Sequence, residues 1–194
     1  MAGGDSGYKG SRYPEDGSAP DLGRRIVVRN RRTVIASGIL LGIGFAGLVD
    51  TVIFHEILQW HHVVSNVVSP TNMDLMRFNI FADGVFLAFT LAAIVAGISL
   101  LLGVFARQHP PSLFTRFFVG LLLLGFGLFN TFDGIVNHFI LGIHHVRDGP
   151  DPLFTDLTFL VVAGFAFIAV GSLLVKQGYN VKTTTSAPAT SASA

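Results

Sequence analysis

The sequence of 194 residues contains no cysteine and few charged residues. The absence of thiols excludes Cys-ligated zinc fingers, iron–sulfur clusters and thiol redox chemistry. Charged residues make up 13% of the chain, about half of the roughly 25% typical of soluble domains. Apolar residues make up 51%, and the mean hydropathy is +0.60. This composition argues against a soluble enzyme, a disordered chain or a disulfide scaffold, and it indicates an integral membrane protein.

Four apolar runs are long enough to cross a bilayer core of about 30 Å, which takes roughly 20 helical residues. They cover residues 34–58, 84–106, 117–141 and 157–175. Each run should be helical, because lipid offers the backbone no hydrogen-bond partner. We therefore predict an all-α fold, a four-helix transmembrane bundle built from two repeated helical hairpins in parallel orientation.

The chain divides into a membrane domain and two polar ends. The predicted membrane domain covers residues 31–179, with a first repeat at about 34–106 and a second at about 117–175. Segments 1–30 and 180–194 are rich in small and polar residues and are predicted to be disordered cytoplasmic tails.

Basic residues predict the orientation of the spans. Of the 13 Lys and Arg residues, only Arg77 and Arg147 fall in the loops that follow the first and third spans. The other basic residues lie on the opposite side, so both termini are predicted to be cytoplasmic and loops 59–78 and 142–156 to face outward. Every acidic residue after Asp21 lies toward this outer side, so we expect any polar site there.

An acid-and-imidazole pattern occurs twice. Residues 50–62 read DTVIFHEILQWHH and residues 133–145 read DGIVNHFILGIHH, so Asp-x4-His-x5-His-His recurs at an offset of 83 residues. Each copy ends an odd-numbered span. This predicts two hairpins related by a pseudo-two-fold axis along the membrane normal.

Asp50 and Asp133 lie inside apolar runs, where an unpaired carboxylate costs about 2.5–3.5 kcal/mol. With the neighbouring imidazoles they predict a transition-metal site on the outward side. Glu56 occurs in the first copy only. Asp83 has no clear counterpart, and Asp156, near the matching end of the fourth span, is only a loose substitute, so we expect the site to be asymmetric. The candidate ligands are His55, His61, His62, His138, His144, His145, Asp50 and Asp133, with Glu56 and Asp83 as further candidates.

Helix geometry restricts how the site can form. On a straight helix His55 and His62 lie about 10.5 Å apart along the axis, too far for one ion with bonds of about 2 Å. Either ligands at similar depth come from different helices, or the helix breaks near Trp60 and the His-His pair folds back over the site. Asp50 and Asp133 then serve as ligands or as acceptors that orient an imidazole.

Imidazole with carboxylate suits zinc, copper(II), iron or manganese, and we favour copper or zinc, with iron as a further option. Haem b is an alternative, with His55 and His138 as axial ligands and the glycines of the spans leaving room for its ring. Close helix packing is the simpler explanation of those glycines.

Three other functions remain open on the sequence alone. They are a membrane oxidoreductase with a dinuclear metal centre or haem, a proton-coupled ion transporter, and a structural accessory subunit without a site. No catalytic residue can be named. Phosphate-binding loops are missing, and the basic residues flank spans as topology and lipid contact require, so we expect the lipid bilayer and no nucleic acid as a partner.

The segments LVDTVIFHEILQWHH and FNTFDGIVNHFILGIHHVR resemble a prokaryotic family of predicted membrane proteins, known as domain of unknown function two-two-four-three. The resemblance extends from about Arg31 to Tyr179 and implies a four-helix protein of a prokaryotic cytoplasmic membrane. Its members look like neighbours of cytochrome oxidase and copper-handling assembly proteins. This implies metal handling, respiratory oxidase assembly or membrane redox chemistry, with a respiratory oxidase or its assembly factors as partners and a homo-oligomer left open. No residue role comes from the resemblance.

Overall fold

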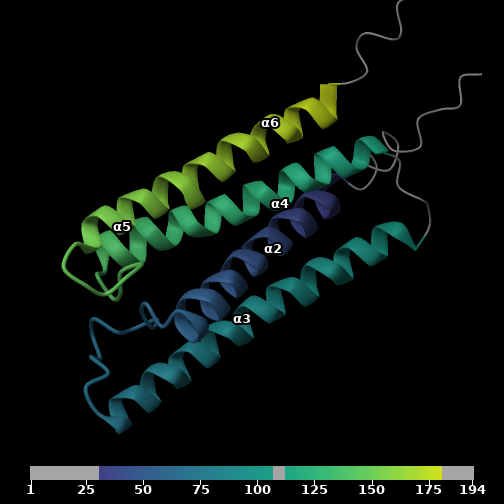
Figure 1. Ribbon diagram of the computed structural model, residues 1–194. Helices are drawn as coiled ribbons and strands as arrows, with labels where there is room; N and C mark the ends of the chain where they lie inside the picture. Colours follow the sequence, from purple (N-terminus) through teal and green to yellow (C-terminus); the bar gives the residue numbers. More distant parts are fainter. Residues whose placement is uncertain (1–30, 107–111, 181–194) are drawn as a thin grey trace, which may run out of the picture.

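The computed structural model describes residues 31–106 and 112–180. In these ranges the chain forms four helical rods and no strand (Figure 1). The first rod is α2 (Arg31–Val49) with a π-helical end, η1 (Asp50–Ile57); the second is α3 (Met73–Phe105); the third is α4 (Ser112–Phe132) with a π-helical end, η2 (Asp133–Ile140); the fourth joins α5 (Pro152–Phe159), η3 (Leu160–Phe165) and α6 (Ala166–Asn180). The predicted tails, apart from Asn180, lie outside the described residues.

Each rod is long and apolar enough to cross a membrane. The four stretches found in the described ranges are Arg31–Ile57, Met73–Phe105, Phe114–Ile140 and Pro152–Gly178. The prediction of an all-α protein with four such helices is confirmed.

All four rods begin earlier than the apolar runs predict, and two of them begin with a polar cap. The side chain of Asn72 accepts hydrogen bonds from the backbone at the start of α3, and Asp151 does the same at the start of α5. Proline at position 152 suits the first turn of a helix, because its missing N–H needs no partner there. Polar caps in the loops therefore extend α3 and α5 beyond their apolar segments.

The rods lie side by side in the order α3, α2, α4, α6 (Figure 1). Small residues allow the close approach of the two central rods, since a Cβ on Gly42 would meet the carbonyl oxygen of Leu122 and, at 2.8 Å, the Cα of Gly125. Such small-residue contacts are typical of helices packed in membranes. The outer rods leave large apolar side chains such as Phe89 exposed, as expected for lipid contact.

The loops after η1 and η2 contact each other at one end of the molecule. The backbone N–H of Asn66 donates to Ile143, and that of Asp148 donates to Trp60, both over 3.0 Å. The guanidinium of Arg147 lies 5.5 Å from the ring centre of Trp60. These contacts join the two loops into one layer over the π-helical ends.

Candidate metal centre

Two π-helical segments bring an acid and an imidazole to the same side of each central rod. In η1 the N–H of Leu58 donates to the carbonyl of Ile53, five residues earlier, over 2.8 Å. Residues five apart follow one another on the face of a π-helix, whereas on an α-helix they are turned by about 140°. Nε2 of His55 consequently lies 3.4 Å from Oδ2 of Asp50.

The third rod repeats this geometry in η2. There Leu141 donates to Val136 over 2.8 Å, again spanning five residues. Nε2 of His138 lies 3.2 Å from Oδ2 of Asp133. The Asp-x4-His spacing therefore fits a π-helix, a helix type that apolar periodicity does not reveal.

Each helix ends in a left-handed residue that reverses the chain. Gln59 has φ of 48° and Gly142 has φ of 58°, and such a residue commonly terminates a helix. The ring of His61 returns to the ring of His55, with centroids 4.5 Å apart. The centroids of the His144 and His138 rings are likewise 4.7 Å apart. Of the two predicted arrangements, the chain adopts the one in which the helix breaks near Trp60 and the first His of each pair folds back.

Two groups of three side chains result. In each, one potential ligand atom per residue lies within 4.8 Å of the other two, and all three residues are buried. The first group is Asp50, His55 and His61, and the second group is Asp133, His138 and His144.

The spacing inside the groups fits a metal ion. Nε2 of His61 lies 3.7 Å from Oδ1 of Asp50, and Nε2 of His144 lies 3.7 Å from Oδ1 of Asp133. Tetrahedral ligands with bonds of about 2.0–2.1 Å stand about 3.4 Å apart. Small side-chain movements therefore bring all three atoms of either group onto one ion.

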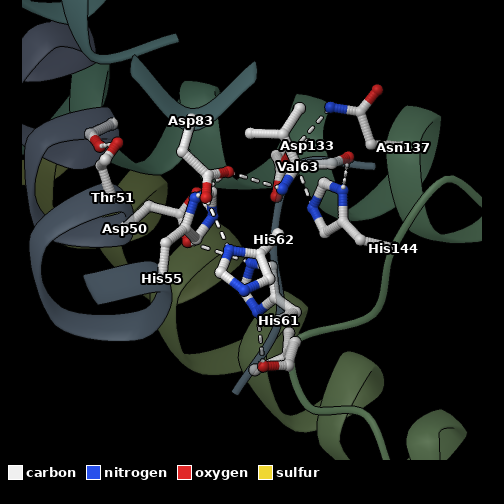
Figure 2. A network of polar contacts seen from close by, with 12 residues as sticks. Asp50, Thr51, His55, His61, His62, Val63, Asp83, Asp133, Asn137 and His144 are labelled. Atoms are coloured by element: carbon white, nitrogen blue, oxygen red, sulfur yellow. Dashed lines mark hydrogen bonds and ion pairs between the residues drawn. The ribbon is translucent and has the colours of Figure 1, made fainter. Parts of the chain in front are cut away.

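Backbone carbonyls fix the protonation of the two folded-back histidines. Nδ1 of His61 donates to the carbonyl of Val146 over 2.8 Å, and Nδ1 of His144 donates to that of Val63 over 2.9 Å (Figure 2). A carbonyl oxygen only accepts, so each Nδ1 carries a proton, and in the neutral ring the Nε2 lone pair is the one that can bind a ligand.

Several ring nitrogens in the groups are left without a partner. Nε2 of His55, His138 and His144 is buried and makes no hydrogen bond within residues 31–106 and 112–180. Buried polar atoms in native proteins are normally paired. Three such atoms directed at neighbouring carboxylates leave places where an ion could be held.

Asp83 supports the first group from behind. It is fully buried, and its Oδ1 lies 2.9 Å from Nδ1 of His55 and accepts the N–H of Val63 over 2.9 Å. Its Oδ2 accepts a 2.6 Å hydrogen bond from Nδ1 of His62 (Figure 2). A carboxylate in this place orients an imidazole for metal binding.

Asp156 does the same for the second group. Its Oδ1 lies 3.1 Å from Nδ1 of His138 and accepts the N–H of Val146, and its Oδ2 accepts from His145 over 2.6 Å. The predicted asymmetry is therefore wrong for the carboxylates that contact the inner histidines, because Asp156 makes the same contacts as Asp83. The sequence offered Asp156 only as a loose substitute, because Asp83 follows Asp50 by 33 positions whereas Asp156 follows Asp133 by 23.

The structure brings together six of the ten candidate ligands. Asp83, His62 and His145 contact the groups from outside, without joining them. Glu56 is exposed and belongs to neither group. An acid near the outer start of each even-numbered span was the available signal for Asp156.

His61 and His144 are stacked, but their pKa values shift in opposite directions. Burial, together with the neighbouring rings of His144 and His55, lowers the pKa of His61 to about 2. Burial also opposes a charge on His144, but contact with Asp133 outweighs it and raises the pKa of that imidazole. Two buried parallel imidazoles carry at most one positive charge between them, so His61 remains neutral.

A cavity of about 380 Å³ lies beside the second group, between the two loops. Its lining includes Ser65, Asp148 and His145, whose side chain is 30% exposed. Because His145 binds Asp156, the cavity leads from the surface to the residues behind the second group.

Comparison with known proteins agrees with this description of a membrane protein. No curated protein and no solved structure matches the chain. A family model described as a predicted membrane protein matches residues 37–178, which include both groups and most of the chain. The chain thus belongs to the DUF2243 family of predicted membrane proteins.

Proposed function

We propose that this membrane protein binds transition-metal ions through the first and second groups. The observation that carries the proposal is a buried set of two imidazoles and one carboxylate, present twice, with unpaired Nε2 atoms at ligand spacing. These Nε2 atoms make no hydrogen bond within the described residues and face carboxylate oxygens at 3.4, 3.2 and 3.7 Å, and an ion between nitrogen and carboxylate would complete their coordination.

Copper or zinc fits the ligand set best, and iron is compatible with it. Three protein ligands leave a coordination position open, which is typical of catalytic and transfer sites and not of structural ones. Thioether is not part of either group, since Met73 is 66% exposed at the start of α3. The set therefore favours copper(II) or zinc over copper(I).

We infer that the protein consists of two duplicated hairpins that run in the same direction. Support comes from matched contacts: His61 with Val146 corresponds to His144 with Val63. The distribution of basic residues places both termini in the cytoplasm and the metal centre toward the outside of a prokaryotic cytoplasmic membrane.

An outward metal centre with an open position suits metal handling, respiratory oxidase assembly or a membrane redox reaction. In the first two, an ion held by three side chains passes to a partner that offers more ligands. A respiratory oxidase or one of its assembly factors is such a partner.

The haem alternative has less support. The rings of His61 and His144 lie between those of His55 and His138, with successive centroids 4.5, 4.8 and 4.7 Å apart. A porphyrin needs the space that these two rings occupy. The glycines of the spans offer no substitute, because sites such as Gly42 are filled by the neighbouring helix.

Transport across the membrane also has less support. At the end of the rods opposite the groups, the interior is an apolar cluster that includes Val34, Phe117 and Leu121. A proton or ion path needs polar groups or water throughout.

Elemental analysis of protein purified from its native membrane, with an absorption spectrum, tests the proposal. We expect bound transition metal and no Soret band. The double variant His55→Ala with His138→Ala should lose the metal, whereas Glu56→Gln, a change of an exposed side chain beside His55, should keep it. Wild-type protein that neither contains nor takes up copper or zinc would refute the proposal.

A further inference from the structure

The imidazoles of the two groups form one continuous row. His55 contacts His61, His61 stacks on His144, and His144 contacts His138, with ring centroids 4.5, 4.8 and 4.7 Å apart. The central pair is parallel to within 1°. The boundary between the groups is therefore a contact between two ligand rings, with no layer of other side chains between them.

This contact limits the distance between two bound ions. An ion bound at Nε2 lies about 3 Å from the centre of its imidazole ring. With ring centres 4.8 Å apart, ions on His61 and His144 lie no more than about 11 Å from each other.

Each group depends on the loop that carries the other. His61 of the first group is held by the carbonyl of Val146, and His144 of the second group is held by the carbonyl of Val63. Val146 N–H in turn binds Asp156, and Val63 N–H binds Asp83. Ordering of one group by an ion consequently fixes the acceptor that orients a ligand of the other.

Buried carboxylates offset the repulsion between two divalent ions. The first group has Asp50 as a ligand and Asp83 behind it, and the second has Asp133 and Asp156. Two ionised carboxylates balance each ion, so the doubly loaded centre carries no excess charge. Loading of one group then places no net positive charge beside the other.

We propose that the two groups bind two metal ions as one dinuclear centre, with positive cooperativity between them. This inference rests on the proposed metal-binding function. The reciprocal carbonyl contacts supply the coupling, because an ion that orders one loop lowers the cost of ordering the other.

Copper(II) is a suitable probe of the distance, because two such ions within about 11 Å broaden each other's electron paramagnetic resonance spectrum. Purified full-length protein in detergent or nanodiscs should bind two equivalents and give a dipolar-broadened spectrum. The variants Asp133→Asn and Asp50→Asn preserve side-chain shape but remove one carboxylate ligand each. Either should bind one equivalent and give the narrow spectrum of an isolated ion.

Copper(II) affinity tests the cooperativity. Coupling free energies between sites commonly correspond to factors of about 5–150 in affinity. The intact group in Asp133→Asn should therefore bind copper(II) at least about 5-fold more weakly than the same group does in the wild type. His138→Ala provides a second half-site variant, and Glu56→Gln serves as the matched control near the first group. Circular dichroism of the metal-free proteins checks that each variant folds.

The outcomes separate this inference from the function on which it rests. Two equivalents with coupled spectra, and weaker binding in both half-site variants, support the dinuclear centre. Two equivalents with uncoupled spectra, or half-site variants of wild-type affinity, would overturn it and leave metal binding intact. A chain that binds no copper(II) or zinc would instead remove the proposed function.

Discussion

The imidazole rings of His61 and His144 are stacked, with planes parallel to within 1° and centroids 4.8 Å apart, although the two residues are 83 positions apart in the chain. Each ring donates its Nδ1 proton to a carbonyl of the opposite loop. The stack therefore joins the two halves of the protein where the candidate ligands meet. A disturbance of either loop should reach both groups.

Asp83→Asn should weaken metal binding without removing a ligand. The carboxylate faces Nδ1 of His55 and accepts hydrogen bonds from His62 and Val63, and an amide cannot accept on both of its polar atoms. Loss of such an orienting partner typically costs about 10–100-fold in metal affinity. Competitive titration with a chelator of known affinity measures the effect.

Asp74→Asn is the matched control for this prediction, because Asp74 is on the same helix with a side chain that is 92% exposed. It should bind metal as the wild type does. Equal affinities for wild type and Asp83→Asn would show that Asp83 does not orient a ligand. Loss of stoichiometry with full affinity at the remaining site would instead identify Asp83 as a ligand.

Gly42→Ala should destabilise the protein. The new methyl group would meet the carbonyl oxygen of Leu122 and the backbone of Gly125, so α2 and α4 would have to separate. Overpacking of this kind costs about 1–3 kcal/mol. Unfolding of the metal-free protein in mixed detergent, followed by circular dichroism, measures the difference.

Gly84→Ala provides the comparison, because a Cβ at Gly84 meets nothing within 4 Å. Alanine is favoured over glycine inside a helix by about 0.5–1 kcal/mol. The variant should therefore be as stable as the wild type or more so. Similar losses in both variants would mean that the α2–α4 contact does not limit stability.

The number and type of the membrane-spanning helices, and part of the candidate site, could be predicted from the sequence. Apolar length fixed the four helices, because a span needs a set number of apolar residues. The Asp-x4-His-x5-His-His pattern identified Asp50 and His55 as candidate site residues, but the helix break near Trp60 was only one of two options. The helix breaks there because Gln59 adopts a left-handed conformation. Glutamine rarely has a positive φ, so the sequence does not predict this conformation.

Other parts of the site leave no mark in the side-chain sequence. The carbonyls of Val63 and Val146 orient His61 and His144, yet every residue has a carbonyl. The sequence matched Asp156 to Asp83 only loosely, because the second connecting loop is shorter than the first. Contacts between loops and backbone groups depend on the tertiary fold, which local patterns do not specify.

Single cysteines should reveal the orientation of the protein. The chain has no cysteine of its own, so one introduced thiol gives a signal without background. Ser69→Cys, at an exposed position in the loop before α3, should react with a membrane-impermeant maleimide in intact cells. Ser186→Cys, near the C-terminus, should react only after permeabilisation, because the distribution of basic residues predicts a cytoplasmic location for that end. The reverse labelling pattern would put the metal centre on the cytoplasmic side.

Metal affinity should fall as the pH falls. An imidazole binds metal only after losing the proton on its ligating nitrogen. Contact with Asp133 raises the pKa of His144 despite the opposing effect of burial, so the metal-free protein holds a proton there at a pH at which an ordinary histidine is neutral. His61, with a pKa lowered by burial to about 2, adds no pH dependence near neutrality.

The proton on His144 sets the direction in which metal affinity changes with pH. Below the pKa of His144, acidification favours the protonated, metal-free state, and affinity at the second group should drop about tenfold per pH unit for one displaced proton. Above that pKa the affinity at this group should level off. Calorimetric titration with zinc in two buffers of different ionisation enthalpy counts the protons released on binding. If no proton is released at neutral pH, then either the second group binds zinc without His144 or Asp133 does not raise the pKa of His144.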